Sequence, residues 1–294
     1  MGWISDAIDA IVDNIKSGAG YLISNLYSID GLNLFGVKFS TSNITDTITQ
    51  LTDFSQTKTM SIYTIGRSIN SVVVPVALSL LTLFFMISLI KRLTEIEKVS
   101  WERVLLWGCY FFLIKALVEK SYTLLTTVMN IVNGVYTDVA SKLTISGTLS
   151  IAQTIKDTFN SMDSLGDVLW GGVIYVILAI PFIGSIVQIW TQVLLRVVKL
   201  MLCMAFSPVP IAMGIEGETY RGKAISYFMY AAGVGFESIV ILIGSWVYTM
   251  GLSDVSSSGS SPLSSVIGML IMNALFIAII QLSHEFSERI FARS

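Results

Sequence analysis

The sequence predicts an all-α, polytopic helical membrane protein with about five transmembrane helices, its N-terminus outside and its C-terminus in the cytoplasm. Of its 294 residues, 53% are hydrophobic and 13% are charged, which is about half the charged share of a soluble domain. Several apolar segments are long enough to cross a bilayer, since roughly 20 helical residues span its ~30 Å hydrocarbon core. Lysine and arginine concentrate at alternate ends of these segments, and this asymmetry sets the orientation.

Residues 1–68 are predicted to be an extracytoplasmic segment that begins with an amphipathic helix. Between residues 4 and 15, isoleucine and valine share one arc of a helix, while Asp6, Asp9 and Asp13 share the other. An acidic face does not favour an anionic lipid surface, so we expect this helix to pack against the protein itself or a partner. The Ser/Thr-rich stretch from Phe39 to Thr59 predicts a loop with at most a short helix.

Residues 69–133 are predicted to form the first two transmembrane helices, joined by a basic cytoplasmic turn. The first crossing, Ile69 to Ile90, carries Pro75 near its start, where a missing backbone donor costs least. Lys91 and Arg92 close it. The second helix runs in pattern from Trp101 to about Val132.

Lys115 and Glu119 lie within this second helix, four residues apart, so they share a face and can pair. A charge near the bilayer centre costs on the order of 2.5 to 3.5 kcal/mol. Two interpretations remain open. Either the membrane-embedded window is shifted toward Val132 and leaves Lys115 shallow, or this face meets water or another subunit.

Residues 134–168 are predicted to be an extracytoplasmic loop with one short helix. Ser150 to Gln153 fits a capping box ahead of a helix that ends near Phe159.

Residues 169–223 are predicted to hold the third transmembrane helix, then an amphipathic segment and a proline turn at the inner face. Arg196 and Lys199 enter an otherwise apolar stretch after Trp190, and we expect both to reach water by snorkelling. Ser207, Pro208 and Pro210 mark a helix break or shallow re-entrant turn. Such backbone is tolerated only where it is buried in protein or lines water.

Residues 224–294 are predicted to hold the last two transmembrane helices and a cytoplasmic tail. Glu237 lies near the middle of the first of these, beside the small-residue pair Ala231 and Gly235, which permits close helix approach. We favour helix packing with a hydrogen-bonded Glu237, either neutral or paired with Lys115, over a pore-lining or proton-linked role. His284 ends the final crossing, and a plain interfacial histidine is the expected interpretation.

The count of five crossings depends on the positive residues. With five crossings, the short inner segments hold Lys91, Arg92, Lys98, Arg103, Arg196, Lys199, Arg221, Lys223, Arg289 and Arg293. The longer outer segments hold Lys16, Lys38, Lys58, Arg67, Lys142 and Lys156. A sixth crossing, made by splitting residues 169–223, would move four inner cations outside and oppose the positive-inside rule.

The sequence gives no indication of catalysis. Cys109 and Cys203 both lie in apolar segments, and His284 is the only histidine, so we expect no metal site and no cofactor. No phosphate loop or nucleophile motif is present, and we expect no catalytic residues and no enzyme.

Three stretches resemble the TrbL-type family of conjugal transfer proteins, the sixth-component family of VirB-like type IV secretion systems. They are Ile65-Gly66-Arg67-Ser68-Ile69-Asn70 with the following Val72-Val73-Val74-Pro75, then Ala205-Phe206-Ser207-Pro208-Val209-Pro210-Ile211-Ala212, and finally Gly233-Val234-Gly235-Phe236-Glu237. The match is closest to the short forms found in Gram-positive conjugative elements, on plasmids or integrated.

This resemblance implies a channel or scaffold subunit in the cytoplasmic (inner) membrane of a bacterium. Its expected partners are further copies of itself in a homo-oligomeric ring, VirB-type ATPases, a coupling protein and bitopic scaffold proteins, besides the lipid bilayer. Single-stranded DNA with its relaxase, or another secreted substrate, would pass it transiently. The alternative is a small-solute or ion-coupled membrane transporter that uses Lys115 and Glu237.

Overall fold

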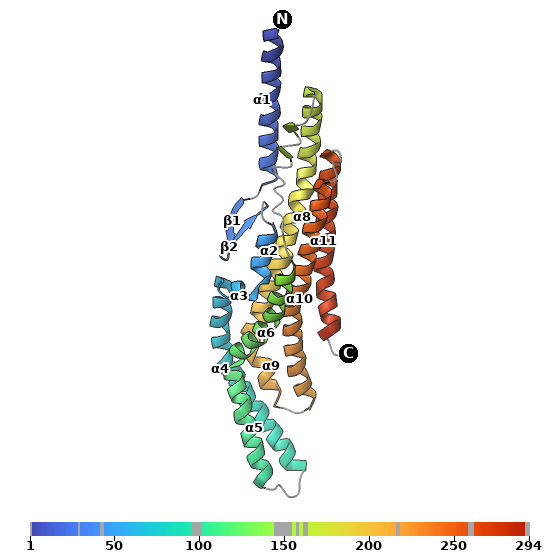
Figure 1. Ribbon diagram of the computed structural model, residues 1–294. Helices are drawn as coiled ribbons and strands as arrows, with labels where there is room; N and C mark the ends of the chain where they lie inside the picture. The colour runs from blue at the N-terminus through green and yellow to red at the C-terminus, as the bar shows by residue number, and fades with distance from the viewer. Residues whose placement is uncertain are drawn as a thin grey trace. The chain divides into compact units, whose positions relative to one another are not determined.

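In the residues that the computed structural model describes, the regular structure is helical apart from one small hairpin (Figure 1). The described residues are 2–28, 30–41, 44–95, 101–143, 155–156, 159–160, 164–215, 218–257 and 262–291. The helices are α1 (Gly2–Leu26), α2 (Ile44–Thr52), α3 (Phe54–Thr57), α4 (Ser61–Glu95), α5 (Trp101–Glu119), α6 (Ser121–Lys142), α8 (Leu165–Phe206), α9 (Pro208–Met213), α10 (Glu218–Ser257) and α11 (Pro262–Phe291). The strands are β1 (Asp30–Leu34) and β2 (Val37–Ser40). The short helix expected before Phe159 falls largely outside the described residues.

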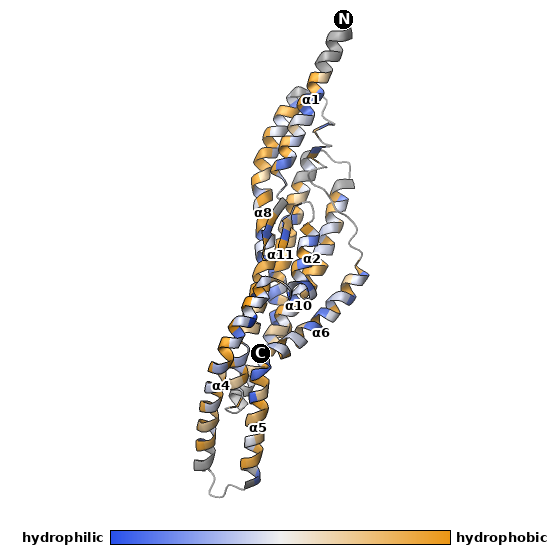
Figure 2. Ribbon diagram, turned by 90° about the vertical axis from the view of Figure 1, so that its left-hand side faces the viewer, coloured by the Kyte–Doolittle hydropathy of each residue, from blue (hydrophilic) through white to orange (hydrophobic). Residues whose placement is uncertain are grey.

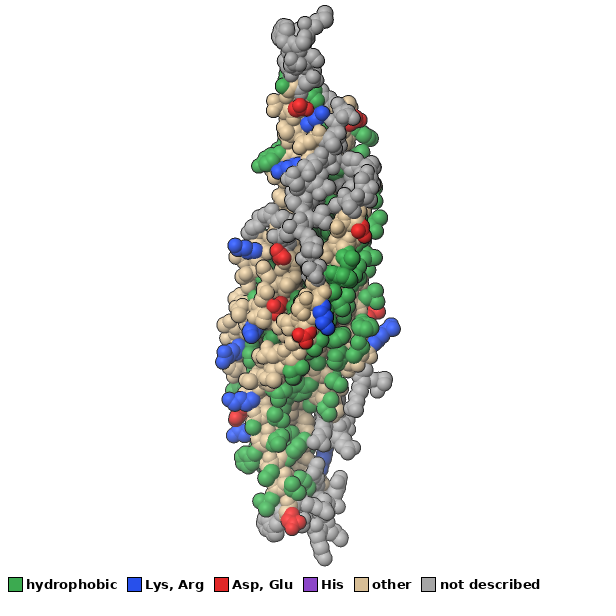
Figure 3. All heavy atoms as spheres, viewed as in Figure 1, with side chains coloured by type: hydrophobic (Ala, Val, Ile, Leu, Met, Phe, Trp, Pro, Cys, Tyr) green, Lys and Arg blue, Asp and Glu red, His purple; other side chains and the backbone are tan. Residues whose placement is uncertain are grey.

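Four helices of the described chain are long and apolar enough to cross a membrane: Ser61–Lys91, Gly166–Phe206, Ala224–Val255 and Ile267–Phe291. Apolar residues run along α4, α5 and α8 (Figure 2), and hydrophobic side chains occupy broad areas of the surface in Figure 3. Leu22, Val72 and Ile180 are 68%, 70% and 75% exposed. A soluble protein rarely leaves so much apolar surface in water, so a polytopic membrane protein is the fold class that these helices fit.

The expected second crossing is divided in the structure. The helix from Trp101 ends at Glu119, and α6 begins at Ser121 and continues to Lys142. Neither part is among the four apolar spans, because α5 carries Glu102, Arg103, Lys115 and Glu119 within 19 residues. Residues 134–142, which were predicted to begin an extracytoplasmic loop, are therefore helical.

The stretch expected to be a loop with at most a short helix, Phe39 to Thr59, contains the end of β2 and the two short helices α2 and α3. Ile44, Ile48 and Leu51 are buried, and their i, i+4, i+7 spacing gives α2 one apolar face. The intervening threonines hid this pattern. Asp53 caps α3 by accepting a hydrogen bond from the Ser55 amide at 2.8 Å.

The chain divides into two compact units. The first comprises residues 1–51, 141–193 and 241–281. In it, the Tyr27 hydroxyl donates to the Tyr175 carbonyl at 2.6 Å and its ring packs on Phe182. Burial, with a smaller contribution from Tyr175, raises the pKa of the Tyr27 phenol above its ordinary value, so it remains a neutral donor. The hairpin joins β1 to β2 through Phe35 and Gly36, both with positive φ, as a two-residue turn favours.

The second unit comprises residues 52–140, 194–240 and 282–294. Its apolar core packs α9 against the neighbouring helices α4 and α5 (Figure 1). Ala77 and Leu81 of α4, Ile114 and Val118 of α5, and Ile211 of α9 are all buried in it. The short helix that follows the proline break is thus enclosed by protein, and the polar side chains described next lie in this same unit.

Candidate functional site

A buried polar cluster in the second unit begins where α8 ends. The Asn70 side chain, 6% exposed on α4, donates to the carbonyls of Met204 and Ala205 at 3.0 and 3.2 Å. In a continuous helix, the Met204 carbonyl would accept from the amide four residues later. That residue is Pro208, which has no N–H. Asn70 therefore replaces the backbone N–H donor that is missing at Pro208.

Ser207 supplies a second donor at the same place. Its hydroxyl donates to the Met204 carbonyl at 2.9 Å and is fully buried. Pro208 occupies the first turn of α9, where its missing N–H and fixed φ are tolerated, and Pro210 follows within the same short helix. The helix interruption lies between α8 and α9, inside protein.

Arg196 was expected to snorkel to water, and the structure corrects this. The helix continues past Trp190 without a break to Phe206, which carries Arg196 into the packed interior, where it is 5% exposed. Its Nε donates to the Val234 carbonyl at 3.0 Å and its guanidinium nitrogen to the Gly235 carbonyl at 3.3 Å. Lys199, three residues on, is half-buried.

Glu237 is buried on α10, and its partner is not the expected Lys115. The Glu237 Oε1 lies 2.7 Å from Nδ1 of His284 on α11, and Glu237 also interacts electrostatically with Arg196. Lys115 instead faces Glu119 at 3.9 Å, with both side chains nearly half exposed. Of the alternatives left open for Glu237, the structure has a hydrogen-bonded carboxylate at a helix contact and not a pair with Lys115, because α5 packs against α4 and α9.

His284 was expected to be a plain interfacial histidine, but it joins two carboxylates. Its Nε2 lies 3.4 Å from Oε1 of Glu288, one turn along α11. A pocket of about 360 Å³ adjoins this group, with a lining that includes Tyr230, Glu237, His284, Ser287, Glu288 and Phe291. The sequence held two signals for this arrangement. His284 and Glu288 have i, i+4 spacing, and a buried Glu237 needs a polar partner.

The small residues of α10 explain how the helices approach. A Cβ added at Gly233 would lie 2.8 Å from the Ser287 hydroxyl of α11, and one at Gly235 would lie 3.0 Å from the Met129 sulfur of α6. Ala231 is fully buried. The predicted small-residue face of α10 is thus in close contact with two helices.

We expect Gly233→Ala to lower the free energy of unfolding by about 1 to 3 kcal/mol, because the added methyl must displace the buried Ser287 side chain. The matched control is Gly222→Ala on the same helix, where nothing lies within 4 Å and alanine should be neutral or stabilising. Thermal unfolding in detergent measures both. Equal midpoints for the two variants would contradict a tight contact at Gly233.

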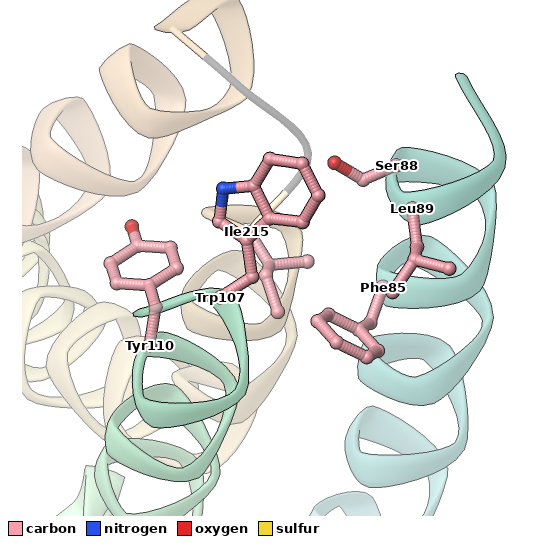
Figure 4. Close-up of a pocket in the computed structure, with 6 residues that line it drawn as sticks. All are labelled: Phe85, Ser88, Leu89, Trp107, Tyr110 and Ile215. Atoms are coloured by element: carbon pink, nitrogen blue, oxygen red, sulfur yellow. The ribbon is translucent and has the colours of Figure 1, made fainter. Parts of the chain in front are cut away.

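A second pocket lies between α4, α5 and the end of α9 (Figure 4). Phe85, Ser88 and Leu89 of α4 face Trp107 and Tyr110 of α5, with Ile215 between them. Its volume is about 20 Å³, which admits about one water molecule. The Tyr110 hydroxyl donates to the Gly214 carbonyl at 3.4 Å. This site therefore packs α9 in place and is too small for a substrate.

These contacts hold charged side chains in the interior of the second unit. Within the described residues, no group of three or more His, Cys, Asp or Glu side chains is placed to hold a metal ion. Comparison of the chain with protein-family models, curated proteins and solved structures finds no match in any of the three.

Proposed function

We propose that this chain is a channel or scaffold subunit of a type IV secretion (conjugation) machine, which helps single-stranded DNA with its relaxase, or another substrate, cross the cytoplasmic membrane of a bacterium. One observation carries the proposal. The three stretches that resemble the TrbL-type family are distant in sequence, yet in the second unit the first contacts the second directly, and the third accepts hydrogen bonds from Arg196 of α8, the helix that leads into the second. Asn70 belongs to the first, Ala205 and Ser207 to the second, and Gly235 and Glu237 to the third.

The charge arrangement supports a polyanion pathway. A bare carboxylate would repel DNA phosphates, but Glu237 is buried and bonded to His284, with Arg196 close by. No buried, unpaired acid is found among the described residues of this cluster.

The proposed topology has five crossings, with the N-terminus outside and the C-terminus inside. With the four apolar spans alone, the cations that follow α4 would lie on the opposite side of the membrane from those that follow α8 and α11. One further crossing between α4 and α8 places all of these cations on the same side. The α5 and α6 segments, 19 and 22 residues long, supply it. Because α5 keeps Lys115 and Glu119 half exposed, this passage would face water or a neighbouring subunit.

Exposed apolar side chains support a homo-oligomer as the working form. On α1, which lies outside the four apolar spans, Ile11, Tyr21 and Leu22 are 59%, 57% and 68% exposed. Another copy of this chain would cover them. VirB-type ATPases, a coupling protein and bitopic scaffold proteins complete the proposed set of partners.

The experiment is a donor strain that lacks this chain, complemented with the wild type or with Ile11→Glu/Leu22→Glu. We expect wild-type complementation to restore DNA transfer and the protein to extract in mild detergent as a large assembly. The double variant should reduce both transfer and assembly size. Asp13→Lys, on the same helix and 78% exposed, is the control that should retain both. Normal transfer without the chain would reject the proposal.

A small-solute or ion-coupled transporter is the second candidate, because a buried carboxylate–histidine pair lies beside a pocket of about 360 Å³. A transport assay on the purified chain alone in proteoliposomes distinguishes these two candidate functions. Solute uptake driven by an ion gradient and lost in Glu237→Gln would favour the transporter, whereas a secretion subunit alone should show none.

A further inference from the structure

Both ring nitrogens of His284 face carboxylate oxygens. Nδ1 lies 2.7 Å from Oε1 of Glu237 on α10, and Nε2 lies 3.4 Å from Oε1 of Glu288 on α11. The histidine therefore connects two helices through a hydrogen bond to Glu237 and lies within ion-pair distance of Glu288 on its own helix. Neither contact follows from the proposed secretion role, and the inference below stands independently of it.

The protonation state of the imidazole decides how many of these contacts are hydrogen bonds. A neutral imidazole carries a proton on one nitrogen only, whereas the imidazolium donates from both. With two ionised carboxylates, neutral His284 can satisfy one acceptor and must turn a lone pair toward the other. The imidazolium satisfies both with charge-assisted bonds.

The exposed fraction of the side chain increases from Glu237 through His284 to Glu288. The side chain of Glu237 is 6% exposed, that of His284 is 37% exposed and that of Glu288 is 54% exposed. A proton that enters the pocket that these residues line can therefore reach the buried contact through His284.

The other titratable groups nearby do not change charge near neutral pH. They are Arg196, Lys199 and Cys203 of α8, Tyr230 of α10, and Tyr63 of α4 and Tyr136 of α6, which interact with Arg196. The lysine ammonium ordinarily titrates well above neutral pH. Arginine stays protonated, and the thiol and phenol groups ordinarily titrate above neutral pH. Among these kinds of side chain, imidazole is the one whose neutral and protonated forms both occur near neutral pH.

We propose that Glu237, His284 and Glu288 form a proton-sensitive latch between α10 and α11, which tightens when His284 takes up a proton and loosens when the proton leaves. The latch acts where the helices already touch. Gly233 approaches the Ser287 hydroxyl so closely that an added Cβ would lie 2.8 Å from it, and Ser287 is between His284 and Glu288 on neighbouring turns of α11. When the imidazolium is bound to both carboxylates, α10 and α11 are therefore held together at this contact.

The test measures thermal unfolding of the full chain in detergent at about pH 5.5 and about pH 8, on either side of the imidazole range. The bonds of the imidazolium contribute stability at the lower pH and lose it as pH rises. We expect the wild-type midpoint to fall by on the order of 4 °C between the two. His284→Gln should abolish most of this fall, and Glu288→Gln should reduce it by about half.

Glu285→Gln is the matched control, because Glu285 is an exposed neighbour on the same helix and the carboxylates that His284 contacts are those of Glu237 and Glu288. This variant should keep the wild-type fall. A second readout uses Cys203, buried in the same unit, as the only thiol in a Cys109→Ser background. Its labelling rate, relative to unfolded protein at the same pH, should rise several-fold at the higher pH in wild type and not in His284→Gln.

Two results would overturn the latch. One is a His284→Gln protein whose midpoint falls with pH as much as that of the wild type. The other is a Glu288→Gln protein that behaves like Glu285→Gln in both readouts. Because Glu288 is the most exposed member, its variant keeps the test informative even where His284→Gln does not fold.

Discussion

Arg196→Met should lose about 3 kcal/mol of the free energy of unfolding, at the lower end of what breaking a buried charge arrangement costs. Methionine fills most of the arginine's volume, so little of the loss comes from a cavity. What is lost is the pair of hydrogen bonds to the Val234 and Gly235 carbonyls and the positive charge near Glu237. The buried carboxylate would then depend on His284 alone.

Lys199→Met is the matched control, since Lys199 lies one turn along α8 and is only half-buried. It should change the free energy of unfolding by less than about 1 kcal/mol. Arg196→Lys should recover part of the loss, because a single ammonium cannot reproduce the fork of a guanidinium. Denaturant unfolding followed by helical circular dichroism measures all three. Similar losses at both positions would mean that Arg196 is not an internal anchor.

The sequence predicted much of the helical framework because bilayer crossing leaves a local signal. Long apolar runs located α4, α8, α10 and α11, and proline chemistry located the interruption at Ser207. The i, i+4 spacing located Lys115 beside Glu119, which the structure places 3.9 Å apart. Each of these inferences needs only residues that are close in the chain.

The polar cluster could not be predicted in the same way because its partners are far apart in sequence. Asn70 is 134 residues from Met204, and Glu237 is 47 residues from His284. Arg196 was misplaced because a basic residue at the end of an apolar run ordinarily marks the membrane boundary. Its hydrogen-bond acceptors are two backbone carbonyls of α10. The glycines of this helix carry no side chain that could cover those oxygens. Only packing brings those groups together.

This same packing suggests why the two prolines after α8 are tolerated. Proline removes a donor from a buried backbone, and an unsatisfied buried carbonyl costs roughly 1 to 3 kcal/mol. The structure meets that cost with side chains from two sources, Asn70 on α4 and Ser207 in the break itself. The interruption is thus tied to α4 as well as to its own helix.

Asn70→Leu combined with Ser207→Ala should therefore lose about 3 kcal/mol of the free energy of unfolding, and more than the sum of the two single variants. Either donor alone still satisfies the Met204 carbonyl, so each single change should cost about 1 kcal/mol. Removing both leaves that carbonyl buried without a partner. Unfolding midpoints in denaturant give the coupling energy.

Pro208→Ala provides the decisive comparison, because it restores a backbone N–H at the position from which a helix would bond to Met204. The backbone at Ser207 is already helical, with φ −53° and ψ −30°, so alanine can donate without rearrangement. In a Pro208→Ala background, the Asn70→Leu/Ser207→Ala pair should lose at least half of its cost. An unchanged cost would mean that these two side chains stabilise the break by packing and not by supplying the donor that proline lacks.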